Sequence, residues 1–306
     1  MDDIPYNFCL GVIVAVGAFP DNISSELWQE ARREYDNKKR SLNINISETP
    51  NGEWKYRVGK QVGFGLEKLL SVNRQFVTFQ SVFVNSVRKT FAENAEFEHF
   101  VSNKDLLDHL IPFVASQTSS HMTYLHIALR ESNEVVAEIL KIFEKYANPK
   151  SLKMVYNCPE SESFLMALMR KKVVAKLELT GEEWSQERLE PHFIDMLKCK
   201  KFHSLDIVQA PNLRITFQIF VKVFESWMER DKCELQLSID GRETVSRQEI
   251  LDYTQQFRFE CKGREPSHDG HYTLQWESGN GKKLLVLRNE YDFRGDLCDV
   301  LSIQAS

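Results

Sequence analysis

The middle of the chain repeats a short apolar–polar–apolar pattern five times. Each copy is a leucine, one polar residue and a second apolar residue, and successive leucines lie 25 to 30 residues apart. The five copies are Leu125–Ile127, Leu152–Met154, Leu177–Leu179, Leu205–Ile207 and Leu235–Leu237. Alternation with period two is typical of a strand, whereas the residues between the copies space their apolar side chains as a helix does. The pattern therefore predicts a strand–helix repeat.

These repeats predict an α/β fold. The predicted strands are 122–128, 151–156, 175–180, 203–208 and 233–239, and the predicted helices are 131–146, 161–170, 182–198 and 215–229. Leucine-rich repeats have periods of roughly 20–29 residues, which most of these gaps match. The favoured interpretation is a leucine-rich-repeat-like strand–helix solenoid. The alternative is an ordinary parallel α/β layer, which also produces Leu-x-apolar triplets.

The first hundred residues predict a short helical N-terminus followed by a β-hairpin. Apolar residues at 4, 8 and 12 would share one side of a helix, and a second helix is predicted over 24–37. Alternating residues in 41–46 and 54–58, joined by Asn51-Gly52, predict the hairpin. A strand over 80–84 and a helix over 104–116 lead into the repeats. The tail, with a short helix near 246–255 and strands over 257–261, 272–276 and 284–287, predicts a β-rich cap on the last repeat.

Composition narrows the class of protein. The chain has 306 residues, 42% of them hydrophobic, so it can bury a sizeable core, and its net charge of −5 argues against nucleic acid or a membrane surface as the main partner. Six cysteines include no Cys-x-x-Cys pair, which is typical of reduced thiols. The apolar run 8–19 follows two aspartates and is too short to span a bilayer. We therefore expect a cytoplasmic or nuclear protein that is not secreted.

Candidate chemistry is sparse. Gly59, Gly63 and Gly65 fit neither of the common phosphate-loop spacings, so a loop is the simpler interpretation. His268 and His271 flank Asp269, but no further ligand completes a metal site nearby. No Ser/His/Asp or Cys/His arrangement has a recognisable context. The sequence therefore predicts no catalytic residue, no metal, no cofactor and no enzymatic activity.

The middle residue of each triplet is the strongest candidate for binding. If the two apolar residues of a triplet face the core, the residue between them faces the other side of the sheet. This alternation predicts a row of five polar side chains across that face: His126, Lys153, Glu178, Asp206 and Gln236. One interpretation is a surface that binds a partner protein, as the concave faces of repeat proteins do. The other is that these are simply solvated strand positions.

The start of the chain resembles the nematode-expanded family of F-box and F-box-associated proteins. The residues that carry the resemblance are the opening Met-Asp-Asp-Ile-Pro-Tyr-Asn-Phe-Cys, the Trp28-Gln29-Glu30-Ala31 segment and the strand–helix units at 177–184 and 205–227. The chain departs from the usual F-box because the central helix and the following Cys/Ser-x-x-Trp are reduced to 20–28. The F-box-like motif is therefore shortened.

The resemblance implies an adaptor role in a cullin–RING (SCF-type) ubiquitin ligase. In the family, the F-box docks on the adaptor subunit of the ligase, and the C-terminal region holds a protein substrate. Carried over by position, the docking residues would be Ile4, Pro5, Phe8 and Val12. The same apolar residues could instead pack on the chain's own hairpin.

Together these observations predict four regions. They are an F-box-like helical segment (1–40), a β-hairpin with a linker or first layer (41–100), a leucine-rich-repeat-like αβ region (101–245) and a β-rich C-terminal cap (246–306). The predicted function is non-enzymatic substrate recognition for the ligase. The alternative is a stand-alone protein-interaction scaffold of the same fold that has lost the ligase contact.

Overall fold

The computed structural model describes most of the chain. The described residues are 9–13, 25–59, 65–86, 98–118, 124–129, 133–229, 235–240, 245–257, 260–264, 272–278, 281–293 and 296–306. The chain divides into two compact units. Unit 1 comprises Met1–His126 and Glu134–Pro149, and unit 2 comprises Ile127–Asn133 and Lys150–Ser306.

Unit 1 is built on the predicted hairpin. β1 (Arg40–Glu48) pairs antiparallel with β2 (Trp54–Val58), and β3 (Val77–Ser86) pairs parallel with β1. β4 (His99–Val101), which the sequence did not predict, pairs antiparallel with β2. β5 (Tyr124–Ala128) begins in this unit and ends in the other. After the helical residues 9–13, the helical segments of the unit are α2 (Glu26–Lys38), α3 (Leu66–Ser71), a 3₁₀ turn (Arg74–Phe76), α4 (Asn103–Asp105), a π-helical turn (Leu106–Leu110), α5 (Ile111–Ser116) and α6 (Glu134–Tyr146).

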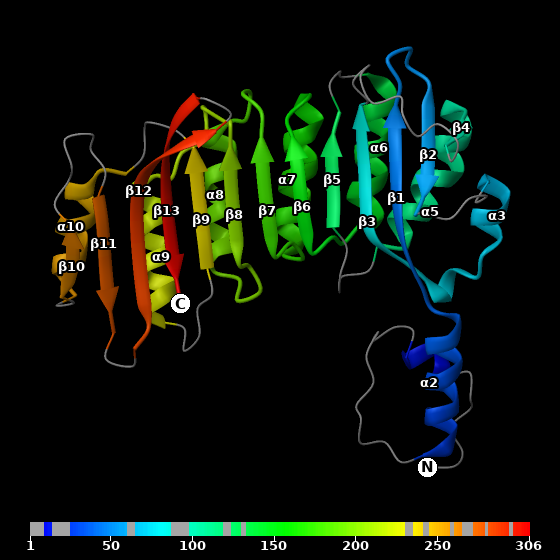
Figure 1. Ribbon diagram of the computed structural model, residues 1–306, viewed down its shortest axis with the longest axis horizontal. Helices are drawn as coiled ribbons and strands as arrows, with labels where there is room; N and C mark the ends of the chain where they lie inside the picture. The colour runs from blue at the N-terminus through cyan, green and yellow to red at the C-terminus, as the bar shows by residue number, and fades with distance from the viewer. Residues whose placement is uncertain are drawn as a thin grey trace. The chain divides into compact units, whose positions relative to one another are not determined.

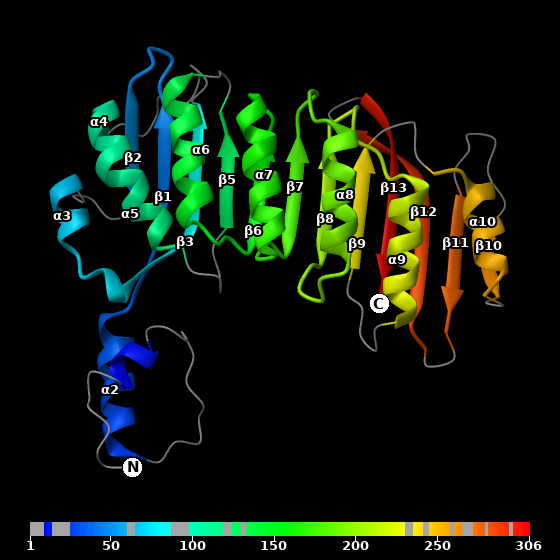
Figure 2. The same ribbon diagram turned by 180° about the vertical axis from the view of Figure 1, so that it is seen from behind.

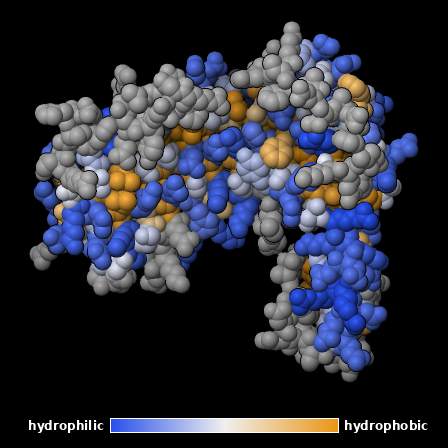
Figure 3. Space-filling model, viewed as in Figure 1, coloured by the Kyte–Doolittle hydropathy of each residue, from blue (hydrophilic) through white to orange (hydrophobic). Residues whose placement is uncertain are grey.

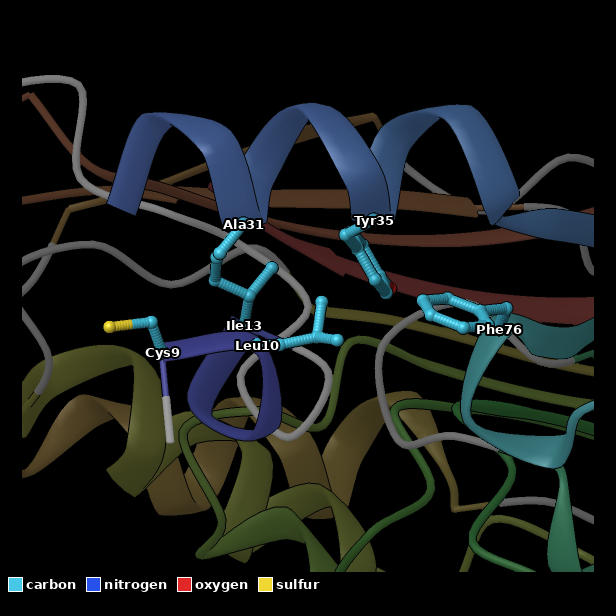
Figure 4. Close-up of a cluster of buried hydrophobic side chains, with 6 residues drawn as sticks. All are labelled: Cys9, Leu10, Ile13, Ala31, Tyr35 and Phe76. Atoms are coloured by element: carbon cyan, nitrogen blue, oxygen red, sulfur yellow. The ribbon is translucent and has the colours of Figure 1, made fainter. Parts of the chain in front are cut away.

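The N-terminal apolar residues pack on α2. Residues 9–13 are helical, and the side chains of this segment that are buried lie against α2 and against Phe76, just before β3 (Figure 4). The cluster consists of Cys9, Leu10, Ile13, Ala31, Tyr35 and Phe76, with Leu27 and Trp28 partly buried beside it. The suggested packing on the hairpin concerned Ile4, Pro5, Phe8 and Val12, and the first three lie outside the described residues.

Unit 2 alternates strands and helices. The elements are β6 (Ser151–Val155), α7 (Pro159–Lys171), β7 (Lys176–Thr180), α8 (Gln186–Leu197), β8 (Ser204–Val208), α9 (Phe217–Glu229), β9 (Leu235–Asp240) and α10 (Arg247–Gln255), followed by β10 (Cys261–Arg264), β11 (Tyr272–Glu277), β12 (Lys283–Phe293) and β13 (Asp296–Ala305). Strands β6 to β9 are parallel and adjacent in sequence order. The α/β class and the individual strands and helices predicted from residue 151 to residue 239 are confirmed, with bounds that shift by a few residues. The leucine-rich-repeat-like solenoid is not shown, because these strands belong to an open, mixed sheet.

The C-terminal strands extend this sheet rather than forming a separate layer. β13 pairs antiparallel with β9, and the order continues through β12, β11 and β10. The sheet of unit 2 is therefore mixed and open. The sequence did not predict β13, and the strand predicted over 257–261 is observed as β10, a few residues later.

Helices α7, α8 and α9 lie on one face of the unit 2 sheet, and no described helix lies on the other (Figures 1 and 2). The strands show this asymmetry residue by residue, since the apolar residues of the triplets are buried and the residues between them are not. Burying a leucine or isoleucine side chain contributes about 1.5–3 kcal/mol, so this face supplies much of the core. Among the described residues, no helix has the length and apolarity needed to cross a bilayer.

Candidate binding face of unit 2

The helix-free face of unit 2 carries a charged row across three parallel strands. Lys153 on β6 lies opposite Glu178 on β7, and Glu178 lies opposite Asp206 on β8. Neighbouring strands are about 4.8 Å apart, so the three side chains are adjacent. Each is only partly buried, because it points away from the helices that cover its apolar neighbours.

The fifth triplet enters the sheet with a shift of two residues. Ser238 lies opposite Asp206, whereas Gln236 lies opposite Ser204, one row further along the strands. A shift of two keeps Gln236 on the helix-free face but removes it from the charged row. Sequence reasoning placed Gln236 in the row because Leu235 matches the repeat spacing, whereas the strand aligns Leu237 with Leu205.

Lys153 and Glu178 form an ion pair. Lys153 Nζ donates to Glu178 Oε1 at 2.5 Å, and the two side chains are 30% and 34% exposed. A pair this accessible to solvent contributes little stability, typically below about 1 kcal/mol. Its main effect is to neutralise one of the two carboxylates on the row.

Asp206 is the other carboxylate. Ser204 Oγ donates a hydrogen bond to Asp206 Oδ2 at 2.8 Å, and this is the polar contact that the described residues give it. Partial burial raises the pKa of the Asp206 carboxyl above its usual range, and the Glu178 carboxylate adds to the rise, while Ser204 and the charge of Lys176 oppose it. A cation brought to this point would therefore stabilise the charged carboxylate.

Two leucines lie on the same face of the antiparallel strands, among polar neighbours. Ser302 on β13 lies opposite Ser238, and Leu287 on β12 lies opposite Ser302. Leu285 and Leu287 are half-buried and alternate with the fully buried Leu284 and Val286, so they face away from the helices. Figure 3 shows hydrophobic residues gathered over β12 and hydrophilic residues over the parallel strands. The sequence did not single out these two leucines, because a run of four apolar residues hides the alternation.

His126 belongs to unit 1. Its ring lies 5.8 Å from the Phe83 ring and 6.2 Å from the Tyr124 ring, measured between centroids. Phe83 is on β3 and Tyr124 is on β5, so the imidazole belongs to a small aromatic cluster. The sequence identified it as a half-exposed strand residue but not its aromatic neighbours.

The four N-terminal docking candidates lie mostly outside the described residues. Ile4, Pro5 and Phe8 precede the first described residue. Val12 is half-buried, next to the fully buried Ile13. The potential metal ligands His268 and His271 also lie outside, and the described residues contain no cluster of His, Cys, Asp or Glu suited to a metal ion.

Comparison with known proteins adds no relative. No family model matches the chain, and no curated protein and no solved structure matches it.

Proposed function

We propose that this chain is a non-enzymatic recognition protein that binds a partner protein through the helix-free face of unit 2. The observation that carries the proposal is the row of Lys153, Glu178 and Asp206 on a face that no described helix covers. The succession of β6 to β9, each parallel to the last, supports leucine-rich-repeat-like units, whose exposed strand faces suit protein partners.

The experiment for this proposal is a charge reversal. The full-length chain and a Glu178→Lys/Asp206→Lys variant, each carrying the same affinity tag, would be purified from the native cells with their bound proteins. We expect a partner that the parent retains and the variant loses, with the melting temperature changed by no more than about two degrees. A Glu187→Lys variant is the matched control, because Glu187 is an exposed residue of α8. Unchanged partners in the double variant would remove this face as the binding surface.

We further propose that the bound protein is a substrate presented to a cullin–RING ubiquitin ligase, as the F-box-like start of the sequence suggests. The apolar character of Phe8 and Val12 supports a docking role for the N-terminal segment. The alternative, a stand-alone interaction scaffold, is favoured by the shortened motif and by the burial of Cys9, Leu10 and Ile13 against α2.

A pull-down with the purified adaptor subunit of the ligase distinguishes the ligase-adaptor function from the stand-alone scaffold. If the chain is a ligase adaptor, the parent binds and a Phe8→Ala/Val12→Ala variant with an unchanged circular dichroism spectrum does not. A well-folded parent that fails to bind the adaptor subunit would leave the stand-alone scaffold.

A further inference from the structure

We propose that the edge of unit 2 at which its parallel strands begin binds a short acidic segment of another protein, through exposed lysine and arginine side chains. Strands β6, β7 and β8 are parallel and in register, so their first residues lie at one edge of the sheet, the lower edge in Figure 1. We call it the cationic edge. It is a second surface, so this inference goes beyond the proposed function and does not depend on it.

Lysine and arginine residues gather at the cationic edge from several elements. Helix α7 ends at Lys171 and α8 ends at Leu197, so the ends of both helices and the starts of the strands that follow them lie at this edge. The exposed cationic residues there are Lys150, Arg170, Lys171, Lys172, Lys176, Lys198, Lys200 and Lys201.

Backbone hydrogen bonds hold the connections that carry these residues side by side. The N–H of Lys176 donates to the carbonyl oxygen of Lys150 at 3.1 Å, and the N–H of Ser204 donates to the carbonyl oxygen of Ala175 at 3.2 Å. Neighbouring strands lie about 4.8 Å apart, which is less than the screening length of about 8 Å at physiological ionic strength. The positive charges of neighbouring connections therefore reinforce one another.

One carboxylate directly contacts these cations among the described residues. Asp195, in the last turn of α8, lies 3.0 Å from Lys172 Nζ and 3.7 Å from Lys198 Nζ. Burial lowers the pKa of the nearby His192, and the positive charge of Arg170 lowers it further, while Asp195 opposes the shift. Asp195 thus offsets part of the local positive charge.

The next carboxylates leave the edge positive. Glu178 lies two residues into β7 and pairs with Lys153. Asp206 lies two residues into β8, and Glu229 ends α9. With Asp195 these are four carboxylates, one of them already paired with Lys153, against the eight exposed cations of the edge.

Helix ends account for part of this charge. A cation in the last turn of a helix meets the negative end of the helix dipole, which explains Arg170 and Lys171 in α7 and Lys198 just after α8. The other cations at the edge include four that lie outside the helices, where no dipole requires them: Lys150, Lys176, Lys200 and Lys201.

The charge of the rest of the chain selects among anionic partners. The net charge is −5, and the opposite edge of the same strands, where α7 and α8 begin, carries the exposed Glu160, Glu182, Glu183 and Glu187. A nucleic acid or a membrane extends over many screening lengths and would also meet negative charge of this chain. A short acidic segment meets the cationic edge alone, and flexible lysine side chains can each reach a carboxylate.

The test measures fluorescence anisotropy of a labelled peptide of about 12 residues, in which glutamate alternates with serine, titrated with the full-length chain. We expect binding that weakens about tenfold or more in the variant Arg170→Gln/Lys200→Gln/Lys201→Gln. The matched control Lys68→Gln/Lys262→Gln/Lys283→Gln removes the same charge from exposed positions elsewhere and should change the affinity less than about twofold. A peptide with glutamine in place of glutamate should not bind, and circular dichroism checks the folding of each variant.

Two further probes separate the acidic segment from other anions. They are a labelled single-stranded DNA of about 20 nucleotides and vesicles of phosphatidylcholine with phosphatidylserine. Tighter binding of either probe than of the peptide, lost in the variant at the edge, would overturn the proposal and identify another class of ligand. No binding of the peptide, or equal weakening in the two triple variants, would also overturn it. These outcomes leave the helix-free face untouched, because the Glu178→Lys/Asp206→Lys variant tests that face separately.

Discussion

Glu162 shows how one buried carboxylate connects two consecutive helices. Only 2% of this α7 residue is exposed. Its Oε1 accepts a hydrogen bond from the backbone N–H of Ser185 at 2.5 Å, and its Oε2 pairs with Arg188 Nη1 at 2.5 Å. Ser185 is the N-cap of α8, so a side chain of one helix satisfies a donor at the start of the next. Glu190 of α8 repeats the arrangement, because it accepts from the hydroxyl of Thr216, which precedes α9.

Removing this carboxylate should destabilise unit 2. Because Glu162→Ala leaves the Ser185 N–H without its acceptor, we expect the free energy of unfolding to fall by about 1.5–3 kcal/mol, measured by urea denaturation. Glu160→Ala is the matched control, since Glu160 is exposed in the first turn of the same helix. Equal losses in the two variants would contradict the role given to Glu162.

Asp206 should make stability depend on pH in the acid range. Its pKa is raised in the folded state, so between the ordinary value of 3.8 and the raised value the unfolded chain releases this proton first. The contribution of Asp206 to stability therefore falls as the pH rises through that window and stays constant above it. We expect Asp206→Asn to be more stabilising at pH 7 than near pH 3.5, in denaturation curves of parent and variant. An effect of the substitution that is the same at both values would contradict the raised pKa.

A lysine from the hairpin of β11 and β12 caps the C-terminal end of helix α9. Lys282, which precedes β12, donates from Nζ to the carbonyl oxygens of Trp227 at 2.9 Å and Met228 at 3.1 Å. These carbonyls belong to the last turn of the helix, where a cation also meets the negative end of the helix dipole. The hairpin after the repeats therefore caps the last long helix as well as extending the sheet.

Replacing this lysine should loosen the end of α9. In Lys282→Met we expect a loss of about 1 kcal/mol and faster hydrogen exchange in the last turn of α9, because its carbonyls lose a charged donor. Lys283→Met controls for the loss of charge, since the neighbouring side chain is exposed. If exchange in the last turn is the same in both variants, Lys282 does not hold the helix end.

Over the molecule as a whole, the sequence alone predicted the strands and helices that a local residue pattern specifies. Leu177-Glu178-Leu179 and its counterparts carry the period of a strand, so the triplets and the helices between them were predicted nearly in place. Pairing between distant segments has no such local signal. Hence β13, which lies between β9 and β12, and the alignment of Ser238 rather than Gln236 with Asp206 emerge only from the structure.

The candidate binding face likewise combines residues that the sequence predicted with residues that it did not. Lys153, Glu178 and Asp206 were predicted because one residue in each triplet must face away from the core. Leu285 and Leu287 were not, because their place beside that row depends on how β12 reaches the parallel strands through β13. The burial of Leu10 and Ile13 against α2 likewise depends on a contact between two separate helices, which composition does not specify.

Site-specific photo-crosslinking in the native cells tests most directly whether this face is the binding surface. A benzophenone side chain would replace Ser238, beside Asp206, and in a second variant Glu187, on the exposed side of α8. We predict a discrete protein adduct from position 238 that disappears when Glu178 and Asp206 are both changed to lysine, and none from position 187. Adducts of the same protein from both positions, or an adduct at 238 that survives the charge reversal, would contradict recognition through the helix-free face.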